Sequence, residues 1–243
     1  MGLLALPATA AAEPLVFVRV NQVGGLERGD FGASYSLEAA RALVAVEGSS
    51  DRGDAYTGAL HHLSAGYGIL DWLSAGVEQS LKQPTSDQLR IGMLSPELRV
   101  RLDRLGLPVE GLGAYVQGRL RITAERPSSL VAGVVLDREH ATFCVVARVG
   151  FEHSVGATVP EYGVRSELGI AWILGESWRL SAEAWGNTHW ASGLSESDYH
   201  AGPSVQYRWQ ALRLGLQLGM GVKSRTRMMV LDSVVSARVA VGF

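Results

Sequence analysis

The feature that most constrains this chain is the alternation in its last sixteen residues, 228–243, which read MMVLDSVVSARVAVGF. Counted back from Phe243, every second residue is apolar except Ser233, whereas the intervening positions include Asp232 and Arg238. Because successive side chains of a β-strand point to opposite faces, the stretch predicts a strand with one apolar and one polar face. About ten such residues cross a lipid bilayer when the apolar face meets lipid and the polar face lines a lumen.

The same alternation recurs along the chain and predicts eleven more strands. The period slips near Ala39 and Ala40, which predicts a bulge, although EAARALVAVE could also form a helix. The fold class expected is therefore all-β: a single closed antiparallel transmembrane β-barrel of about 12 strands in an up-and-down meander, with a soluble sandwich as the alternative. The additional strands are expected at 31–47, 54–69, 72–82, 94–103, 112–122, 129–137, 142–153, 162–173, 178–189, 199–209 and 212–223.

The connections between these stretches sort into two alternating sets. ILDW, DRLGLP, DREH, LGES and WQAL are short, whereas GSSDRGD, KQPTSDQ, ERPSS, SVGATVPE, WASGLSESD and KSRTR are more polar and mostly longer. Short periplasmic turns and longer extracellular loops are typical of outer-membrane barrels. Aromatic residues at the strand ends indicate interfacial girdles, namely Tyr162, Trp172, Trp178, Trp190, Tyr199, Trp209 and Phe243.

Two stretches resemble known outer-membrane proteins. A final strand that ends on an aromatic residue, here Phe243, is similar to the terminal strand of bacterial outer-membrane barrels, and that resemblance implies recognition by the barrel-assembly machinery. The phrase GYGILDWLSAGVE resembles a hairpin in the family identified as the putative MetA pathway of phenol degradation. This second resemblance implies a transporter-like barrel in the outer membrane of a Gram-negative bacterium, with a link to the uptake of aromatic compounds.

The ends of the chain and its composition suggest the domain organisation. Residues 1–12 form a short apolar run that ends in Ala10-Ala11-Ala12, as expected for the remnant of a signal peptide. Residues 13–30 are expected to be a periplasmic lead-in or a plug, and residues 31–243 the barrel. A net charge of −2 does not indicate a protein that binds nucleic acid. The sequence contains no run of 18 apolar residues, so no membrane-spanning helix is predicted. The partners expected are outer-membrane lipid, lipopolysaccharide and a small-molecule solute.

The polar face of the predicted strands is rich in arginine. Such an interior is either a ladder of salt bridges that stiffens the barrel or a narrow pore whose arginines attract anionic or polar solutes. An arginine placed at Gln217, inside, should cost far less stability than one at Leu216 or Val239, which face lipid. The residues expected to line the lumen are Arg99, Arg101, Arg119, Arg121, Arg148, Glu152, Arg165, Glu167, Arg179, Glu183, Arg208, Arg213, Gln217, Asp232 and Arg238.

The function that these observations favour is a channel or small-solute transporter for passive uptake of small polar, anionic or aromatic molecules, and not an enzyme. One alternative is a lipid-modifying hydrolase of the outer membrane, because Glu152-His153-Ser154 resembles the His-x-Ser-Asn element of lipid A deacylases. It departs from that element because its His and Ser are adjacent and point to opposite strand faces. The other alternative is a structural or assembly-partner barrel with no open pore. His61, His62 and His200 lack supporting ligands at metal-site spacing, so neither a metal nor a cofactor is expected.

Overall fold

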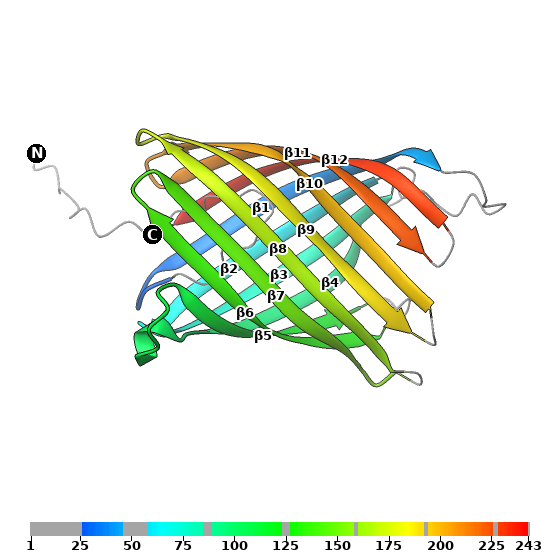
Figure 1. The fold of residues 1–243 in the computed structure, drawn as a ribbon, viewed down its shortest axis with the longest axis horizontal. Helices are drawn as coiled ribbons and strands as arrows, with labels where there is room; N and C mark the ends of the chain where they lie inside the picture. The colour runs from blue at the N-terminus through cyan, green and yellow to red at the C-terminus, as the bar shows by residue number, and fades with distance from the viewer. Residues whose placement is uncertain are drawn as a thin grey trace, which may run out of the picture.

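The computed structural model is a closed barrel of twelve antiparallel strands in simple meander order. It describes residues 26–45, 58–84, 89–122, 127–157, 160–191, 194–225 and 228–242. The strands are strongly tilted, and β1 closes the cylinder by pairing with β12 (Figure 1). Their bounds are β1 Phe31–Ala45, β2 Gly58–Leu70, β3 Leu73–Pro84, β4 Arg90–Arg101, β5 Leu112–Arg121, β6 Ser128–His140, β7 Phe143–Val155, β8 Glu161–Leu174, β9 Trp178–Ala191, β10 Leu194–Trp209, β11 Leu212–Arg225 and β12 Met228–Gly242.

The closing seam joins two segments that lie at opposite ends of the chain. Its register runs from Gly32 opposite Gly242 to Ala45 opposite Val230, with one shift between Ala42 and Val44. The predicted bulge in this strand therefore occurs, but three residues beyond Ala39, and the EAARALVAVE segment is strand as far as Ala45. Because the strand number is even, the first residue of β1 and the last of β12 lie at the same end of the barrel (Figure 1), called the terminal end below.

The outer wall of the barrel is an apolar surface. Outward positions alternate with buried ones along each strand, and exposed residues such as Leu98, Val116, Leu180, Leu218 and Val239 form a continuous band. A soluble protein rarely exposes so much contiguous apolar surface, whereas a wall that faces lipid requires it. No helix in the described ranges combines the length and the apolar character that crossing a bilayer demands.

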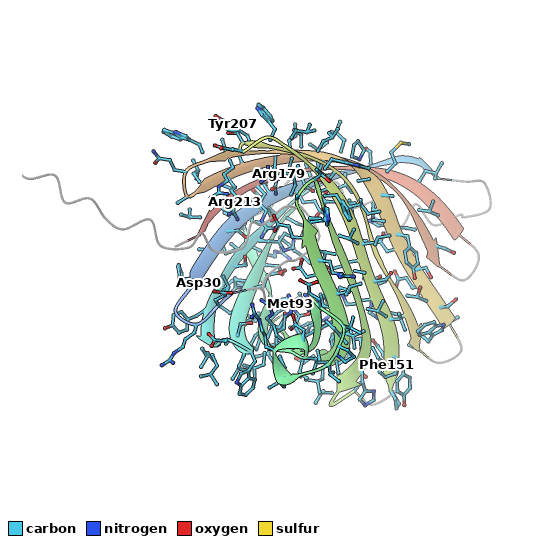
Figure 2. All side chains as sticks on the ribbon, turned by 60° about the vertical axis from the view of Figure 1, so that its left-hand side comes forward. Asp30, Met93, Phe151, Arg179, Tyr207 and Arg213 are labelled. Atoms are coloured by element: carbon cyan, nitrogen blue, oxygen red, sulfur yellow. The ribbon has the colours of Figure 1, made fainter. Side chains whose placement is uncertain are left out.

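Aromatic side chains border this band at both ends. Trp172, Trp178 and Trp209 are exposed at the terminal end, and Tyr162 and Trp190 are exposed at the opposite end, as the sequence predicts. Phe151 and Tyr207 also point away from the wall, near opposite ends (Figure 2). Phe243 lies outside the described residues, as do residues 1–25.

Two connections at the end opposite the termini are shorter than the sequence predicted. WASGLSESD is almost entirely strand, because β9 continues to Ala191 and β10 begins at Leu194, and β11 and β12 are separated by residues 226–227 alone. Polar residues do not end these strands because the ladder of backbone hydrogen bonds continues past the apolar band. The β6–β7 turn also falls at 141–142, just after the predicted Arg138-Glu139-His140.

The longest connection at the terminal end, 102–111, replaces the short turn that DRLGLP was expected to form. A 3-10 turn at Asp103–Leu105 is held by the Asp103 carboxylate, which accepts hydrogen bonds from Arg101 at 3.2 Å and from the Gly111 backbone at 3.0 Å. Burial acts to raise the pKa of Asp103, but these hydrogen bonds and the Arg101 charge outweigh it and lower the pKa below its ordinary value. The carboxylate therefore stays ionised while it holds the turn.

Residues 26–30 fold against the inner side of the first hairpin. The backbone of Gly29 donates to the Gly68 carbonyl at 2.9 Å, and the Gly68 amide donates to the Asp30 carbonyl at 3.0 Å. A side chain at Gly68 would collide with the Glu27 carbonyl, so glycine is required for this close approach. The end of the predicted 13–30 lead-in or plug is thus tied to the terminal end of the barrel, and residues 13–25 of it lie outside the described part.

The exposed apolar wall predicts a strong difference between its two faces. Leu216 points outward near the middle of β11, so Leu216→Arg should lower the free energy of unfolding by about 2–4 kcal/mol, because the charge must enter lipid. Asn187→Arg, on the inner face and partly exposed, should cost much less. Urea unfolding in lipid vesicles measures both, and equal losses would contradict the assignment of the faces.

Candidate functional site

All but one of the residues predicted to line a lumen have described side chains, and these side chains lie on the inner face of the barrel. Asp232 belongs to β12 and pairs with Gly221, but its side chain lies outside the described part of the structure. The others divide by burial. Those that are buried are Arg99, Arg148, Glu152, Arg179, Glu183, Arg213, Gln217 and Arg238, and those that are partly exposed are Arg101, Arg119, Arg121, Arg165, Glu167 and Arg208.

One buried ion pair bridges distant strands. Nη2 of Arg148 on β7 donates to the Glu97 carboxylate on β4 at 2.5 Å, and both residues are buried. The Arg148 guanidinium lies 3.7 Å from the centre of the Tyr115 ring on β5, which adds a cation–π contact. Tyr115 can lie flat on the wall because Gly150 has no side chain to obstruct its hydroxyl. The long side chains of Arg148 and Glu97 thus tie β7 to β4 across β5 and β6.

A second pair lies nearer the end opposite the termini. Nη1 of Arg119 is 2.8 Å from both carboxylate oxygens of Glu152, and the hydroxyl of Ser129 donates to the same carboxylate at 2.5 Å. These contacts join β5, β6 and β7. Together these two pairs join β4–β7, as expected of the salt-bridge ladder that was one of the two readings of the sequence.

A third polar cluster joins β9 and β10. The Ser204 hydroxyl donates to the Glu183 carboxylate, and the hydroxyl oxygens of Ser204 and Ser181 are 2.5 Å apart. Nothing in the alternation of the sequence indicates which serines make such contacts, so Ser129, Ser181 and Ser204 were missed. The register that places Ser181 opposite Ser204 is the signal that would have identified the last two.

The lumen is densely packed at the level of Gln217. Its side chain is 1% exposed, and neither amide atom has a hydrogen-bond partner among the described residues. Glu183 and Ser204 are also buried on neighbouring strands. That an arginine at Gln217 costs far less stability than one at Leu216 or Val239 stays a prediction. Because a larger side chain must overpack this buried level, the partly exposed Asn187 is the milder position on the inner face.

Four arginines gather on β9–β12 toward the terminal end. Arg208 and Arg213 are directly opposite each other in the β10–β11 register, and Arg213 also interacts electrostatically with Arg179 and Arg238. Figure 2 shows Arg179 and Arg213 inside the wall, toward the end that carries Asp30. We call Arg179, Arg208, Arg213 and Arg238 the arginine cluster.

Two glutamates lie near the arginine cluster. Glu183 is the acidic residue on the inner face of this half of β9–β12, and Glu139 approaches from β6 and interacts with Arg179, Arg208 and Arg213. Like charges placed opposite each other on neighbouring strands destabilise a sheet. The four arginines of the cluster therefore outnumber these two carboxylates.

His153 and Ser154 do not form a catalytic pair. His153 is exposed on the outer wall and stacks on Tyr162, with ring centres 5.0 Å apart, whereas Ser154 is buried and accepts a hydrogen bond from the Glu161 backbone at 2.9 Å. His61 also lies on the outer wall, bonded to Tyr35 at 2.8 Å, and is separated from the inward His62. Across the described residues, no group of three or more His, Cys, Asp or Glu could hold a metal ion.

No known family model matches the chain, and no curated protein sequence matches it. Solved structures do. The COG4313 outer membrane channel from Pseudomonas putida F1 is similar with a TM-score of 0.56 and 11% identity, covering 98% of this chain and 99% of that chain. This chain has the fold of an outer-membrane channel. The CymD monoaromatic hydrocarbon channel is also similar, with a TM-score of 0.50 and 12% identity, covering 90% of this chain and 89% of that chain.

These two channels confirm, at the level of the fold, the resemblance to transporter-like barrels that the sequence suggested. At 11% and 12% identity the likeness concerns the fold alone. What this chain can bind therefore depends on the side chains of its own inner face.

The buried Arg148–Glu97 ion pair predicts that removing one charge destabilises the barrel more than removing both charges. Arg148→Gln leaves the buried Glu97 carboxylate without its cation, and should lower the free energy of unfolding by about 3–5 kcal/mol. Glu97→Gln combined with Arg148→Gln removes both charges and should recover a large part of that loss. The exposed pair Arg138–Glu110 is the control, expected to contribute about 0–1 kcal/mol. Urea titration of the refolded protein measures all of these, and a double variant as unstable as the single one would contradict the prediction.

Proposed function

We propose that this protein is a channel of the bacterial outer membrane that allows small polar and anionic solutes, including aromatic ones, to diffuse passively through a narrow lumen. The observation that carries the proposal is the arginine cluster on the inner face of β9–β12, where Arg208 and Arg213 lie directly opposite each other. Such a concentration of like charge has a stability cost, and its chemical use is to attract anions into a confined space.

Aromatic solutes are a further class that we include in the proposal. Val135, Cys144, Val146 and Ala171 form a buried apolar cluster on the inner face of β6–β8. Arg179 interacts with Cys144, so the apolar cluster and the arginines are neighbours. These four side chains are at most 2% exposed, so they pack within the inner wall, and the arginines beside them are the groups that a solute would meet. CymD, whose fold this chain shares, is a channel for monoaromatic hydrocarbons, which makes aromatic solutes a natural class to test.

The alternative of a lipid-modifying hydrolase has no supporting geometry, since His153 and Ser154 lie on opposite faces of β7. The alternative of a structural barrel is represented by the salt-bridge ladder, which accounts for β4–β7. The ladder does not account for the arginine cluster on β9–β12. A ladder of salt bridges places opposite charges next to each other, whereas the cluster places like charges next to each other.

Ion selectivity tests the channel proposal directly. In a planar bilayer with a salt gradient, the purified protein should conduct and prefer anions, and Arg208→Gln, Arg213→Gln and Arg238→Gln together should shift the reversal potential toward that of a nonselective pore. Arg138→Gln, which removes an exposed arginine from the outside of the wall, should leave the reversal potential unchanged. A silent protein, or a triple variant with unaltered selectivity, would refute the proposal.

The buried side chain of Gln217 allows a test of whether its level of the lumen limits the ionic current. Because its amide makes no hydrogen bond with described residues, Gln217→Ala should cost less stability than a comparable truncation of a bonded side chain. It should also open space at the level of Gln217 and raise the single-channel conductance. Ser64→Ala, on the inner face of β2 and bonded to Ser34, is a matched substitution away from this level. A Gln217→Ala channel with wild-type conductance would show that another level limits flow.

A further inference from the structure

Polar side chains interrupt the apolar outer wall on β1–β3. Tyr35 on β1, His61 on β2, and Gln79 and Gln83 on β3 face outward, because they alternate with inward residues and pair with outward ones in the register. We call these four residues the outer polar patch. The other amide side chains of the described strands point into the lumen, namely Gln117, Asn187, Gln206 and Gln217. Two amides on a wall that faces lipid therefore set β1–β3 apart from the rest of the barrel.

Three members of the patch form a chain of hydrogen bonds across the strands. The Tyr35 hydroxyl lies 2.8 Å from Nδ1 of His61, and Nε2 of His61 lies 3.2 Å from Oε1 of Gln83. With the imidazole proton on Nε2, the hydroxyl donates to the ring and the ring donates to the amide oxygen. The chain then ends in an acceptor, the Tyr35 oxygen, and in donors, the amide hydrogens of Gln83. Both end residues are exposed on the wall.

Gln79 lies inside the apolar band. It is opposite the exposed Leu63 and seven residues beyond Trp72, which is exposed in the turn at the terminal end. At roughly 3.3 Å per residue and a strand tilt of about 40°, this separation places Gln79 roughly 18 Å into a band about 25 Å tall. The Gln79 amide nitrogen is covered by its own barrel, where it makes no hydrogen bond with any described residue.

The surrounding lipid cannot supply the missing hydrogen bonds of Gln79. Acyl chains have neither donors nor acceptors, so an unsatisfied amide in the bilayer carries a large free-energy cost. Lipid headgroups have both, but they lie beyond the borders of the apolar band. Rotation about its terminal bonds turns the amide away from its own barrel and toward a neighbour. The surface that satisfies it is therefore that of another protein within the membrane.

Small side chains on both sides of the patch allow such a surface to come close. On the outward face Ala33 is paired with Ala65, and Ala39 with Ala59. These two rows enclose the rows that contain Tyr35 and His61. Protein interfaces inside membranes are enriched in small residues, because these let two backbones approach each other. The outward face of β1–β3 thus combines hydrogen-bonding groups with a shallow surface around them.

We propose that the outer polar patch is the interface between two copies of this barrel, related by a twofold axis along the membrane normal. A twofold axis brings the same patch to both sides of an interface, so the patch has to be complementary to itself. It meets that condition, because an amide carries both donors and an acceptor, and because the Tyr35–His61–Gln83 chain ends in one group of each kind. This interface is on the outer wall, so it does not depend on the proposed channel function.

Cross-linking in lipid vesicles tests which face two barrels share. Leu63 lies between Tyr35 and Gln79 in the register and is 46% exposed, so Leu63→Cys places a thiol at the centre of the patch. Leu168 on β8 is equally exposed and six strands away in the closed ring, so Leu168→Cys is the matched control. At high lipid dilution, a short bis-maleimide should convert most of the first variant to a covalent dimer and little of the second. The native Cys144 is buried, so the unaltered protein gives the background.

Removing the Gln79 amide separates an interface role from a structural one. In sedimentation equilibrium in density-matched micelles, Gln79→Leu should raise the dissociation constant of the dimer about tenfold, because both copies lose a hydrogen bond. The urea midpoint of the monomeric barrel should not fall, because leucine suits lipid better than an amide does. Ser166→Ala removes a polar group from the outward face of β8 and should leave the dissociation constant unchanged.

Three results would overturn the proposed interface. The first is a wild-type barrel that sediments as a monomer at every concentration, which is also the result expected if a different membrane protein covers the patch. The second is equal cross-linking of the Leu63→Cys and Leu168→Cys variants. The third is a Gln79→Leu barrel that associates as strongly as the wild type or that loses stability as a monomer.

Discussion

The structure depends on the hydrogen-bonded seam between β1 and β12. An unpaired strand edge exposes a row of backbone amides and carbonyls that lipid cannot solvate, so a sheet that meets a bilayer has to close. Here the closing partners are the first and last strands of the chain, joined from Gly32–Gly242 to Ala45–Val230. Once the sheet is closed, every residue of every strand belongs either to the apolar outer wall or to the lumen. The position of each charged side chain follows from that division.

The closed interior determines how charge can be arranged. A narrow lumen excludes most water, so an isolated buried charge would cost several kcal/mol. The pairs Arg148–Glu97 and Arg119–Glu152 meet that demand with short contacts between long side chains. They also fix β4–β7 into one rigid wall, against which the rest of the inner face can carry charge less evenly. The arginine cluster is held partly by neutral acceptors, because Arg179 donates to the Gly175 and Trp178 carbonyls and Arg238 to the Ser34 hydroxyl.

The alternation of the sequence was sufficient to predict the strand number and the face on which most of the assigned, described residues lie. Arg99, Arg179 and Arg213 lie on the inner face because side chains have a period of two in any strand, whatever its neighbours. The same rule predicted the exposed Leu216 and Val239. Strand ends were harder to predict, because WASGLSESD is polar yet continues the ladder beyond the apolar band.

The contacts across the lumen could not be predicted in this way. The partner of Arg148 is three strands away, and its identity depends on the stagger of the whole barrel and on which rotamers reach across Tyr115. The packing of Gln217 has the same origin: the sequence shows that it points inward, but only the barrel diameter decides whether space remains beside it. Periodicity thus gives the direction of a side chain, whereas closure and stagger determine its partner.

The order of the levels along the lumen gives the inner face a direction. From the end opposite the termini, the pairs Arg119–Glu152 and Arg148–Glu97 come first and the arginine cluster comes last. The pairs join neighbouring strands through opposite charges, whereas the arginine cluster places like charges on adjacent strands. Because the two sets lie at different depths and on different strands, substitutions in one set leave the contacts of the other in place.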